Sequence, residues 1–205
     1  MNKKNDRRGA RLRQEVAAEA ARILATEGQR NYRNAKQKAA VRLGISPRSV
    51  LPSNSEVEAE LKRRQELYGG PAHSEQLAGL RGAAVKAMEF FDAFRPKLVG
   101  PVLEGTADAH SRICLHLFCE SEEEVTRFLL EHNLAFEHET RRIRWHDGSY
   151  RDLELLVLEA GGNIVELALM AGPAARQAPP SPIDGKPQRR AGMAEVARLA
   201  AGGEF

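Results

Sequence analysis

The apolar spacing of this chain changes period at Pro96, and that change limits the folds open to it. Before Pro96, apolar residues recur every three or four positions, which is the spacing of an amphipathic helix. After it, they alternate with polar residues or form short apolar runs, as they do in β-strands. The pattern predicts an α+β protein, with a helical N-terminal region followed by a small mixed β-sheet domain.

The same spacing predicts where the elements lie. Helices are expected over 11–26, 34–43, 56–67 and 74–94, then a helix over 121–133 and a short one over 193–200. Strands are expected over 98–103, 111–119, 135–145, 151–159 and 164–170. Residues 172–190 hold five of the ten prolines and have little periodicity. We therefore expect three parts: a basic helical region over 1–70, an α+β domain over 71–171, and a proline-rich tail over 172–205.

Composition excludes several classes of protein. Hydrophobic residues make up 42% and charged residues 29% of the chain, as in globular proteins rather than disordered ones. No apolar run approaches the roughly 18 residues that a membrane-spanning helix needs, so no membrane partner is expected. The two cysteines do not form a disulfide framework, and the N-terminus lacks an apolar export signal. The expected location is the cytoplasm.

Charge is distributed unevenly along the chain. Residues 1–50 contain 13 Lys or Arg and 4 Asp or Glu, a net charge of +9, whereas the remainder contains 18 basic and 24 acidic residues, a net charge of −6. A basic segment of this kind can attract a polyanion, or it can interact electrostatically with the acidic remainder of the same chain. Composition leaves both interpretations open.

The stretch from Leu98 to Phe118 carries the most specific pattern. An apolar run ends at Gly105-Thr106, a short polar turn follows, and Ser111 begins an alternating segment. This order resembles the signature of the nucleotidyltransferase superfamily: a strand, Gly-Ser, a short helical turn, and Ser-Asp-x-Asp at the start of the next strand. The resemblance covers about residues 88–170 and implies a sheet domain of nucleotidyltransferase-like type.

The resemblance also implies a ligand, a nucleotide or another phosphate-containing small molecule. Gly105 and Thr106 match the Gly-Ser pair, whose small residues let backbone amides approach phosphate closely. Ser111 matches the serine that precedes the acids. In an active member of the superfamily those acids hold magnesium, which neutralises the transferred phosphoryl group.

The two acidic positions depart from the family pattern. They hold Arg112 and Cys114, a cation and a thiol where carboxylates would bind a hard dication. Glu166 fits the position of the third acid, and Asp152 on the preceding predicted strand is a second candidate. We therefore expect a nucleotidyltransferase-like protein that binds a nucleotide or phosphate ligand. Any remaining transferase activity would depend on Glu166 and Asp152, with magnesium as cofactor.

An alternative function is nucleic-acid binding or transcription regulation without catalysis, through the basic N-terminal helices. Residues 15–28 are similar to the opening helix of TetR-type regulators, and residues 39–46 resemble part of a helix-turn-helix. Pro47 and Pro52 would shorten any recognition helix that follows. This interpretation predicts salt-dependent affinity for DNA or RNA through residues 1–50.

Two further clusters have ordinary structural explanations. Cys114 and His116 share one face of a predicted strand, with His110 at its entrance, and such residues more often pack or hydrogen-bond than bind zinc. Arg141-Arg142-Ile143-Arg144-Trp145 places cations beside an aromatic ring, where phosphate or a stacked base could be held. Solvated arginines on an exposed strand explain that run at least as well.

Overall fold

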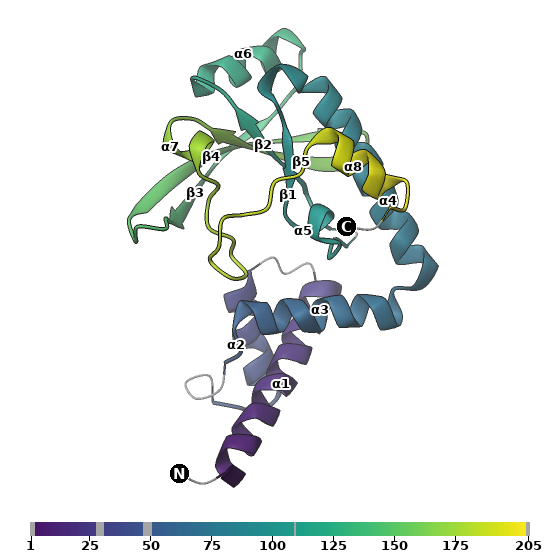
Figure 1. Cartoon of the computed structure of the whole chain (residues 1–205), viewed down its shortest axis with the longest axis vertical. Helices are drawn as coiled ribbons and strands as arrows, with labels where there is room; N and C mark the ends of the chain where they lie inside the picture. Colours follow the sequence, from purple (N-terminus) through teal and green to yellow (C-terminus); the bar gives the residue numbers. More distant parts are fainter. Residues whose placement is uncertain (1–2, 28–30, 47–50, 109, 204–205) are drawn as a thin grey trace. The chain divides into compact units, whose positions relative to one another are not determined.

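The computed structural model describes residues 3–27, 31–46, 51–108 and 110–203. The chain divides into two compact units (Figure 1). The first contains residues 1–73 together with 182–184, and the second contains residues 74–181 and 185–205. No helix among the described residues has the length and apolar character needed to cross a membrane.

The first unit is built from three helices, α1 (Lys3–Thr26), α2 (Tyr32–Arg42) and α3 (Asn54–Tyr68). Asn31 caps α2 by accepting hydrogen bonds from two backbone amides, and Ser53 forms a capping box with Glu56 at the start of α3. The helices bury a shared apolar core in which alanines let backbones approach closely; it includes Val16, Ala20, Ile23, Ala35, Ala39, Val57 and Leu61. The predicted helices of this region are confirmed.

The spacing between α2 and α3 bears on the resemblance to a helix-turn-helix. That motif joins its two helices by a turn of about three or four residues. Here the whole segment 43–53 separates α2 from α3, and Pro52 is buried just before the N-cap of α3. Pro47 lies outside the described residues. The observed connection is therefore longer than the one that a helix-turn-helix uses.

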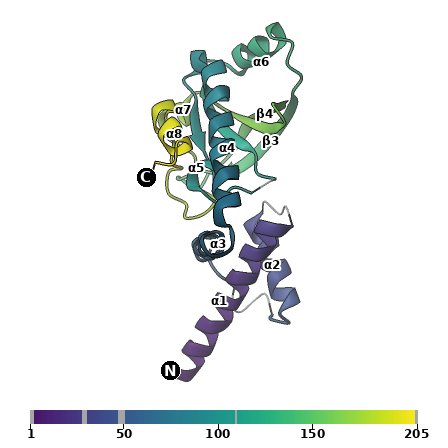
Figure 2. The same cartoon turned by 90° about the vertical axis from the view of Figure 1, so that its right-hand side faces the viewer.

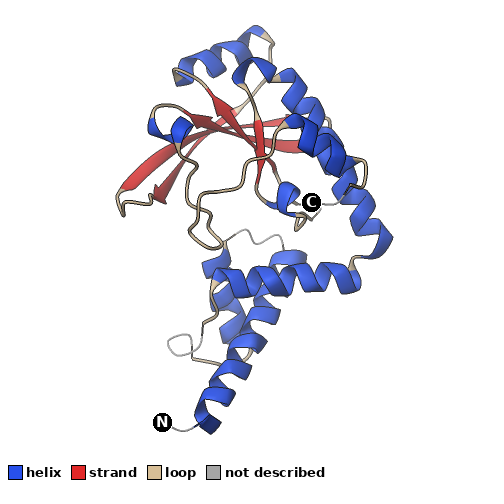
Figure 3. Cartoon of the chain, viewed as in Figure 1, coloured by secondary structure: helices blue, strands red, loops and turns tan. Residues whose placement is uncertain are grey.

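The second unit contains a five-stranded mixed sheet (Figure 3). Its strands are β1 (Lys97–Val99), β2 (Ile113–Phe118), β3 (Glu137–Arg144), β4 (Tyr150–Ala160) and β5 (Asn163–Met170). They are arranged in the order β1-β2-β5-β4-β3. Only β2 and β5 are parallel, and the other neighbouring pairs are antiparallel. The predicted α+β class, with helices first and a mixed sheet after them, is confirmed.

One face of the sheet, which we call the helix face, carries the main core. Helices α4 (Gly70–Phe90), α6 (Glu122–Glu131) and α8 (Met193–Ala200) cover it (Figure 2). Arg81 of α4 is 8% exposed, and its guanidinium donates to the carbonyl oxygens of Val102, Leu103 and Leu199. The strands contribute Leu98, Ile113, Leu115, Leu117, Leu156, Leu158, Val165, Leu167 and Leu169.

The opposite face, which we call the tail face, has a smaller apolar cluster. Ala174 of α7 (Pro173–Arg176) packs there against Phe118, Ile143, Leu153, Leu155, Ala168 and Met170. The tail then returns to the sheet, where Ala191 exchanges two backbone hydrogen bonds with Leu98 of β1. The remaining strand positions of this face are mixed: Val99 and Val157 are buried and apolar, whereas Lys97, His116, Arg141 and Glu166 are polar or charged.

The segment 98–103 is not a single strand, and this prediction was wrong. β1 ends at Val99, Gly100 takes a positive φ of 73°, and Pro101 begins the short helix α5 (Pro101–Glu104). Glycine adopts that backbone conformation without a Cβ clash, and proline suits a first helical position because it has no N–H to satisfy. Val102 and Leu103 are apolar because this helical turn buries them.

Candidate functional site

The residues after β1 determine which glycine lies beside the predicted site. Gly100 follows the strand directly, α5 supplies a short helical turn, and Ser111 then leads into β2. A Cβ placed on Gly100 would lie 3.8 Å from Cβ of Cys114. In the signature that the sequence resembles, the glycine directly follows the strand, as Gly100 follows β1 here, whereas Gly105 comes after α5. The signal in the sequence was Gly100-Pro101 after Leu98-Val99.

Gly105 and Thr106 lie instead at the end of α5. Gly105 has a φ of 82°, and a Cβ there would lie 3.7 Å from the Arg81 guanidinium and 3.9 Å from the Leu77 side chain, both of α4. Thr106 is only 8% exposed. This turn is therefore packed against α4, and Thr106 is largely shielded from a ligand.

Ser111 has local partners. Its hydroxyl donates to Oδ1 of Asp108 at 2.9 Å and accepts a hydrogen bond from the Asp108 backbone amide. The same carboxylate oxygen accepts from the backbone amide of His110. These bonds close a turn of the kind that short polar side chains stabilise, and Ser111 holds the chain at the entrance of β2.

The tail face carries a cluster of four charged side chains at the start of β2. Arg112 donates to Glu166 at 3.1 Å and to both carboxylate oxygens of Glu139 at 3.0 Å. Arg141 donates to the same oxygen of Glu166 at 2.7 Å. The side chain of Glu166 is 6% exposed, whereas that of Arg141 is 50% exposed. The cluster thus has a buried carboxylate at its centre and an accessible guanidinium at its rim.

These contacts keep both guanidinium groups charged. The hydrogen bonds to Glu139, and secondarily to Glu166, raise the pKa of Arg112 despite its burial. Burial lowers the pKa of Arg141, but its hydrogen bond to Glu166 and the nearby negative charge outweigh that effect and raise it. Two cations and two anions therefore form a formally neutral group.

Parallel pairing of β2 with β5 explains why positions 112, 114 and 166 meet. Cys114 and Glu166 are register partners, and Arg112 lies two residues before Cys114 on the same face. The positions that the resemblance matches to the three metal-binding acids therefore lie together on the tail face. The residues present do not fit magnesium, because one is a guanidinium bound to the remaining carboxylate and another is a thiol. Among the described residues, no group of three or more His, Cys, Asp or Glu is placed to hold a metal ion.

Asp152 is not brought to this cluster. It pairs with Arg142 of β3, and alternation along β4 places it on the same side as Glu154, Leu156 and Leu158, which is the helix-face side. Glu166 lies on the tail face. The two predicted catalytic carboxylates therefore point to opposite sides of the sheet.

Sequence reasoning missed the roles of Arg141 and Glu139. Both are on β3, which neighbours β4 and not β2, so the contact of Glu139 with Arg112 and that of Arg141 with Glu166 depend on the reach of long side chains rather than on strand adjacency. The run from Arg141 to Trp145 was the only available signal. Of its other members, Arg142 lies over the ring of Tyr150 at 5.0 Å from the ring centroid.

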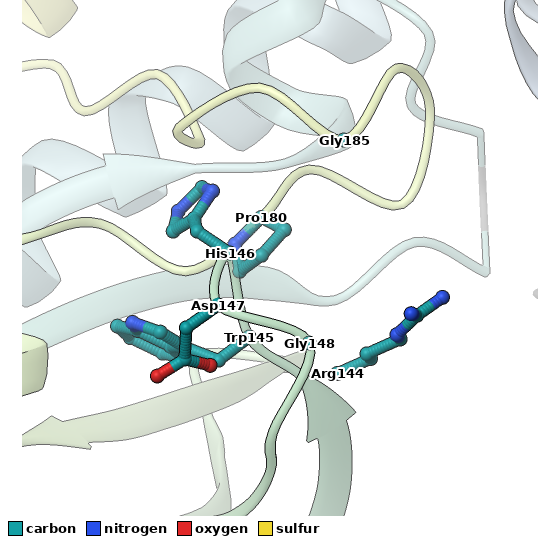
Figure 4. A pocket seen from close by; sticks show the side chains of 7 residues that line it. All are labelled: Arg144, Trp145, His146, Asp147, Gly148, Pro180 and Gly185. Atoms are coloured by element: carbon teal, nitrogen blue, oxygen red, sulfur yellow. The ribbon is translucent and has the colours of Figure 1, made fainter.

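A cavity of about 480 Å³ lies at the turn between β3 and β4 (Figure 4). It is lined by two residues of the run 141–145 but by none of the residues that the resemblance to nucleotidyltransferases singles out. Arg151 stacks over Trp145 at 4.4 Å from its ring centroid, and Asp147 accepts hydrogen bonds from Ser149 and Arg151. The carboxylate of Asp147, which lines the cavity, is therefore already hydrogen-bonded within the protein. The lining residues are Arg144, Trp145, His146, Asp147, Gly148, Pro180 and Gly185.

A buried histidine lies further along the tail face. His116 is 2% exposed, and its Nδ1 accepts a hydrogen bond from Nε of Arg190 at 3.0 Å. Burial, and to a lesser degree the charge of Arg190, lowers the pKa of His116 to about 3. The ring is therefore neutral, with its proton on Nε2 as the contact to Arg190 requires.

Comparisons of the chain with family models, curated proteins and solved structures gave no match.

The central carboxylate supports a stability prediction. Replacing Glu166 by Gln leaves two guanidinium groups without their shared buried anion, and we expect a loss of about 2 kcal/mol in the free energy of unfolding. Glu139→Gln is the matched control, because Glu139 is 37% exposed and its pair is worth under about 1 kcal/mol. Urea unfolding followed by fluorescence of Trp145, the single tryptophan, measures both. Equal losses in the two variants would contradict a central role for Glu166.

His116 supports a prediction on pH. The unfolded chain binds a proton at His116 near pH 6.5, whereas the folded chain does so only near pH 3, so folding stability falls as the pH drops through this window. The contribution reaches at most about 1.4 kcal/mol per pH unit. In His116→Asn, the amide oxygen keeps an acceptor for Arg190 but does not titrate. Urea unfolding between pH 4 and 7 is expected to show a shallower pH dependence in this variant. Identical slopes would show that His116 does not contribute.

Proposed function

We propose that the second unit is a noncatalytic, nucleotidyltransferase-like domain that binds a phosphate-bearing ligand, most simply a nucleotide. The observation that supports this proposal is the convergence of positions 112, 114 and 166 on one sheet face, beside Gly100. The order of strand, glycine, helical turn, serine and strand agrees with the signature described above. A guanidinium at the first acid position supplies positive charge where the family uses a metal ion.

Binding would replace one contact of the charged cluster. Of the two carboxylates, Glu139 has the more exposed side chain, at 37% against 6% for Glu166. A phosphate that displaces Glu139 accepts hydrogen bonds from the two terminal nitrogens of Arg112 and contacts Arg141 at the edge of the cluster. In addition, Nε of Arg112 is buried without an acceptor among the described residues, and a bound oxyanion would provide one.

Catalysis is not part of the proposal, because in the part of the chain that the structure describes no group of three or more His, Cys, Asp or Glu is placed to hold a metal ion. Asp152 lies on the other face, and Glu139 is held by Arg112. Binding would therefore not require magnesium.

Calorimetry with ATP, GTP, CTP and UTP, each with and without magnesium, tests this function. We expect binding of at least one nucleotide, with an affinity that magnesium does not increase. Glu139→Gln removes the competing charge and is expected to tighten binding roughly fivefold, whereas Arg141→Gln weakens it by a similar factor. No heat with any of the four nucleotides, in the wild type and in Glu139→Gln, would refute the proposal.

A second candidate function, nucleic-acid binding through the basic helices, is favoured by one observation in the first unit. Glu19 and Glu27 neutralise Arg22, Lys38 and Arg42 through short ion pairs. Near the start of α1, in contrast, Arg7, Arg8 and Arg13 are exposed and have no carboxylate within 4 Å among the residues that the structure covers. Exposed arginines that form no close ion pair can neutralise the phosphates of a nucleic acid.

The variant Arg7→Glu/Arg8→Glu/Arg13→Glu tests this candidate without removing α1, on which α2 and α3 pack. Its matched control is Arg127→Glu/Arg176→Glu/Arg198→Glu, which makes the same charge change at exposed positions of the second unit. Fluorescence anisotropy with a labelled 20-nucleotide DNA and RNA, between 50 and 200 mM salt, is expected to show weaker binding and a shallower salt dependence only in the first variant. Equal effects of the two variants would argue against a specific role for α1.

A further inference from the structure

Three cations gather at the far end of β2, on the tail face. His116 is the register partner of Lys97 on β1 and the acceptor for Arg190 of the tail. Two residues further on, Phe118 has the guanidinium of Arg190 over its ring at 4.9 Å from the centroid, and that of Arg95 at 5.9 Å. Arg95 precedes β1, Lys97 begins it, and Arg190 comes from the tail. Arg95 and Arg190 both approach the Phe118 ring, and Lys97 lies across from His116 in the register.

None of these three cations has a carboxylate within 4 Å among residues 3–27, 31–46, 51–108 and 110–203. Arg190 donates only to neutral acceptors, which are His116, the sulfur of Met170 and the carbonyl oxygen of Ala174. Its half-buried position lowers the pKa of its guanidinium, which means that the folded protein bears a cost for keeping it charged. Elsewhere on the same face, Arg112 and Arg141 are neutralised by two glutamates.

The backbone adds a second cost at this point. Arg95 has a φ of 47°, in the left-handed region that side chains other than Gly, Asn and Asp seldom occupy. Arginine is therefore a poor choice for local conformation at this position. Its guanidinium nevertheless lies 5.9 Å from the centroid of the Phe118 ring, which the guanidinium of Arg190 also approaches, and among the described residues neither arginine has a carboxylate within 4 Å.

We propose that Arg95, Lys97 and Arg190 form a binding site for a phosphate-type dianion, carried by a small phosphorylated molecule, beside Phe118. Two guanidinium groups offer paired N–H donors to the oxygens of a phosphate, and the ammonium group of Lys97 adds a point charge. His116 is a positioning residue, because its acceptor nitrogen orients Arg190. Phe118 positions both arginines through its ring face.

This site is distinct from the charged cluster of Arg112 and Glu166. Arg112 precedes the first residue of β2 and Phe118 is the last, which separates the two by about 20 Å along an extended strand. A single phosphate group cannot contact both, so either site can exist without the other.

The test is a titration of the full-length ¹⁵N-labelled protein with inorganic phosphate and with pyrophosphate, at constant ionic strength, followed by amide NMR. We expect shifts at the amides of Arg95, Lys97 and Leu98, and of residues 116–118 and 189–192. The variant Arg95→Asn/Lys97→Gln removes two cations, and Asn tolerates the left-handed backbone of position 95. Arg190 is left in place because it also holds the tail. The affinity for phosphate, measured from the shifts of these amides, is expected to fall at least about tenfold in this variant.

Arg127→Gln/Arg198→Gln is the matched control, because it removes two exposed arginines of α6 and α8 on the helix-face side; it should leave the affinity unchanged within twofold. Arg141→Gln should also leave it unchanged, which separates this site from the proposed nucleotide site. Unperturbed amides elsewhere in Arg95→Asn/Lys97→Gln show that the fold is kept. The proposal is overturned if phosphate and pyrophosphate shift none of these amides in the wild type, or if the double variant and its control weaken binding equally.

Discussion

Parallel pairing between β2 and β5 is the constraint on which the rest of the second unit depends. It places Cys114 opposite Glu166 and so decides that these residues share the tail face. The same register sends Ile113, Leu115, Val165 and Leu167 into the core under α4, α6 and α8. A shift of one residue would exchange the two faces, burying charge and exposing the core, so packing and site geometry are set together.

The two ends of β2 on this face balance charge differently. At its start, two arginines and two glutamates compensate each other, and a buried carboxylate is stabilised by cations that remain partly accessible. At its end, cations surround a neutral histidine and a phenylalanine without a carboxylate partner in the described part of the chain. Buried or crowded charge costs free energy unless it is paired. A ligand would therefore compete with glutamate at the first end and supply the missing charge at the second.

Much of the fold was predictable because hydrophobic periodicity reports directly on burial. The helix over 193–200 and the strands over 113–118, 150–160 and 163–170 follow from local spacing. The helix over Pro101–Glu104 was not predicted, because two adjacent apolar residues such as Val102 and Leu103 are compatible with both a one-turn helix and a short buried strand. The candidate site was predicted only in part. Of the predicted residues, Glu166 lies in the charged cluster, whereas Asp152 faces the other side of the sheet and Gly105 and Thr106 lie at the end of α5. Arg112 and Cys114 were identified only as departures from the acidic positions.

The sequence by itself determined the elements and the unequal distribution of charge, and it placed a cation and a thiol at the positions where the resembling family has acids. These are local properties, because they depend only on the order and spacing of residues along the chain. Only the tertiary structure decided that Arg141 reaches Glu166, that Asp152 faces away from it, and that Arg190 returns from the tail to lie over Phe118. Such contacts depend on strand order and on chain closure between distant segments, which no local pattern encodes.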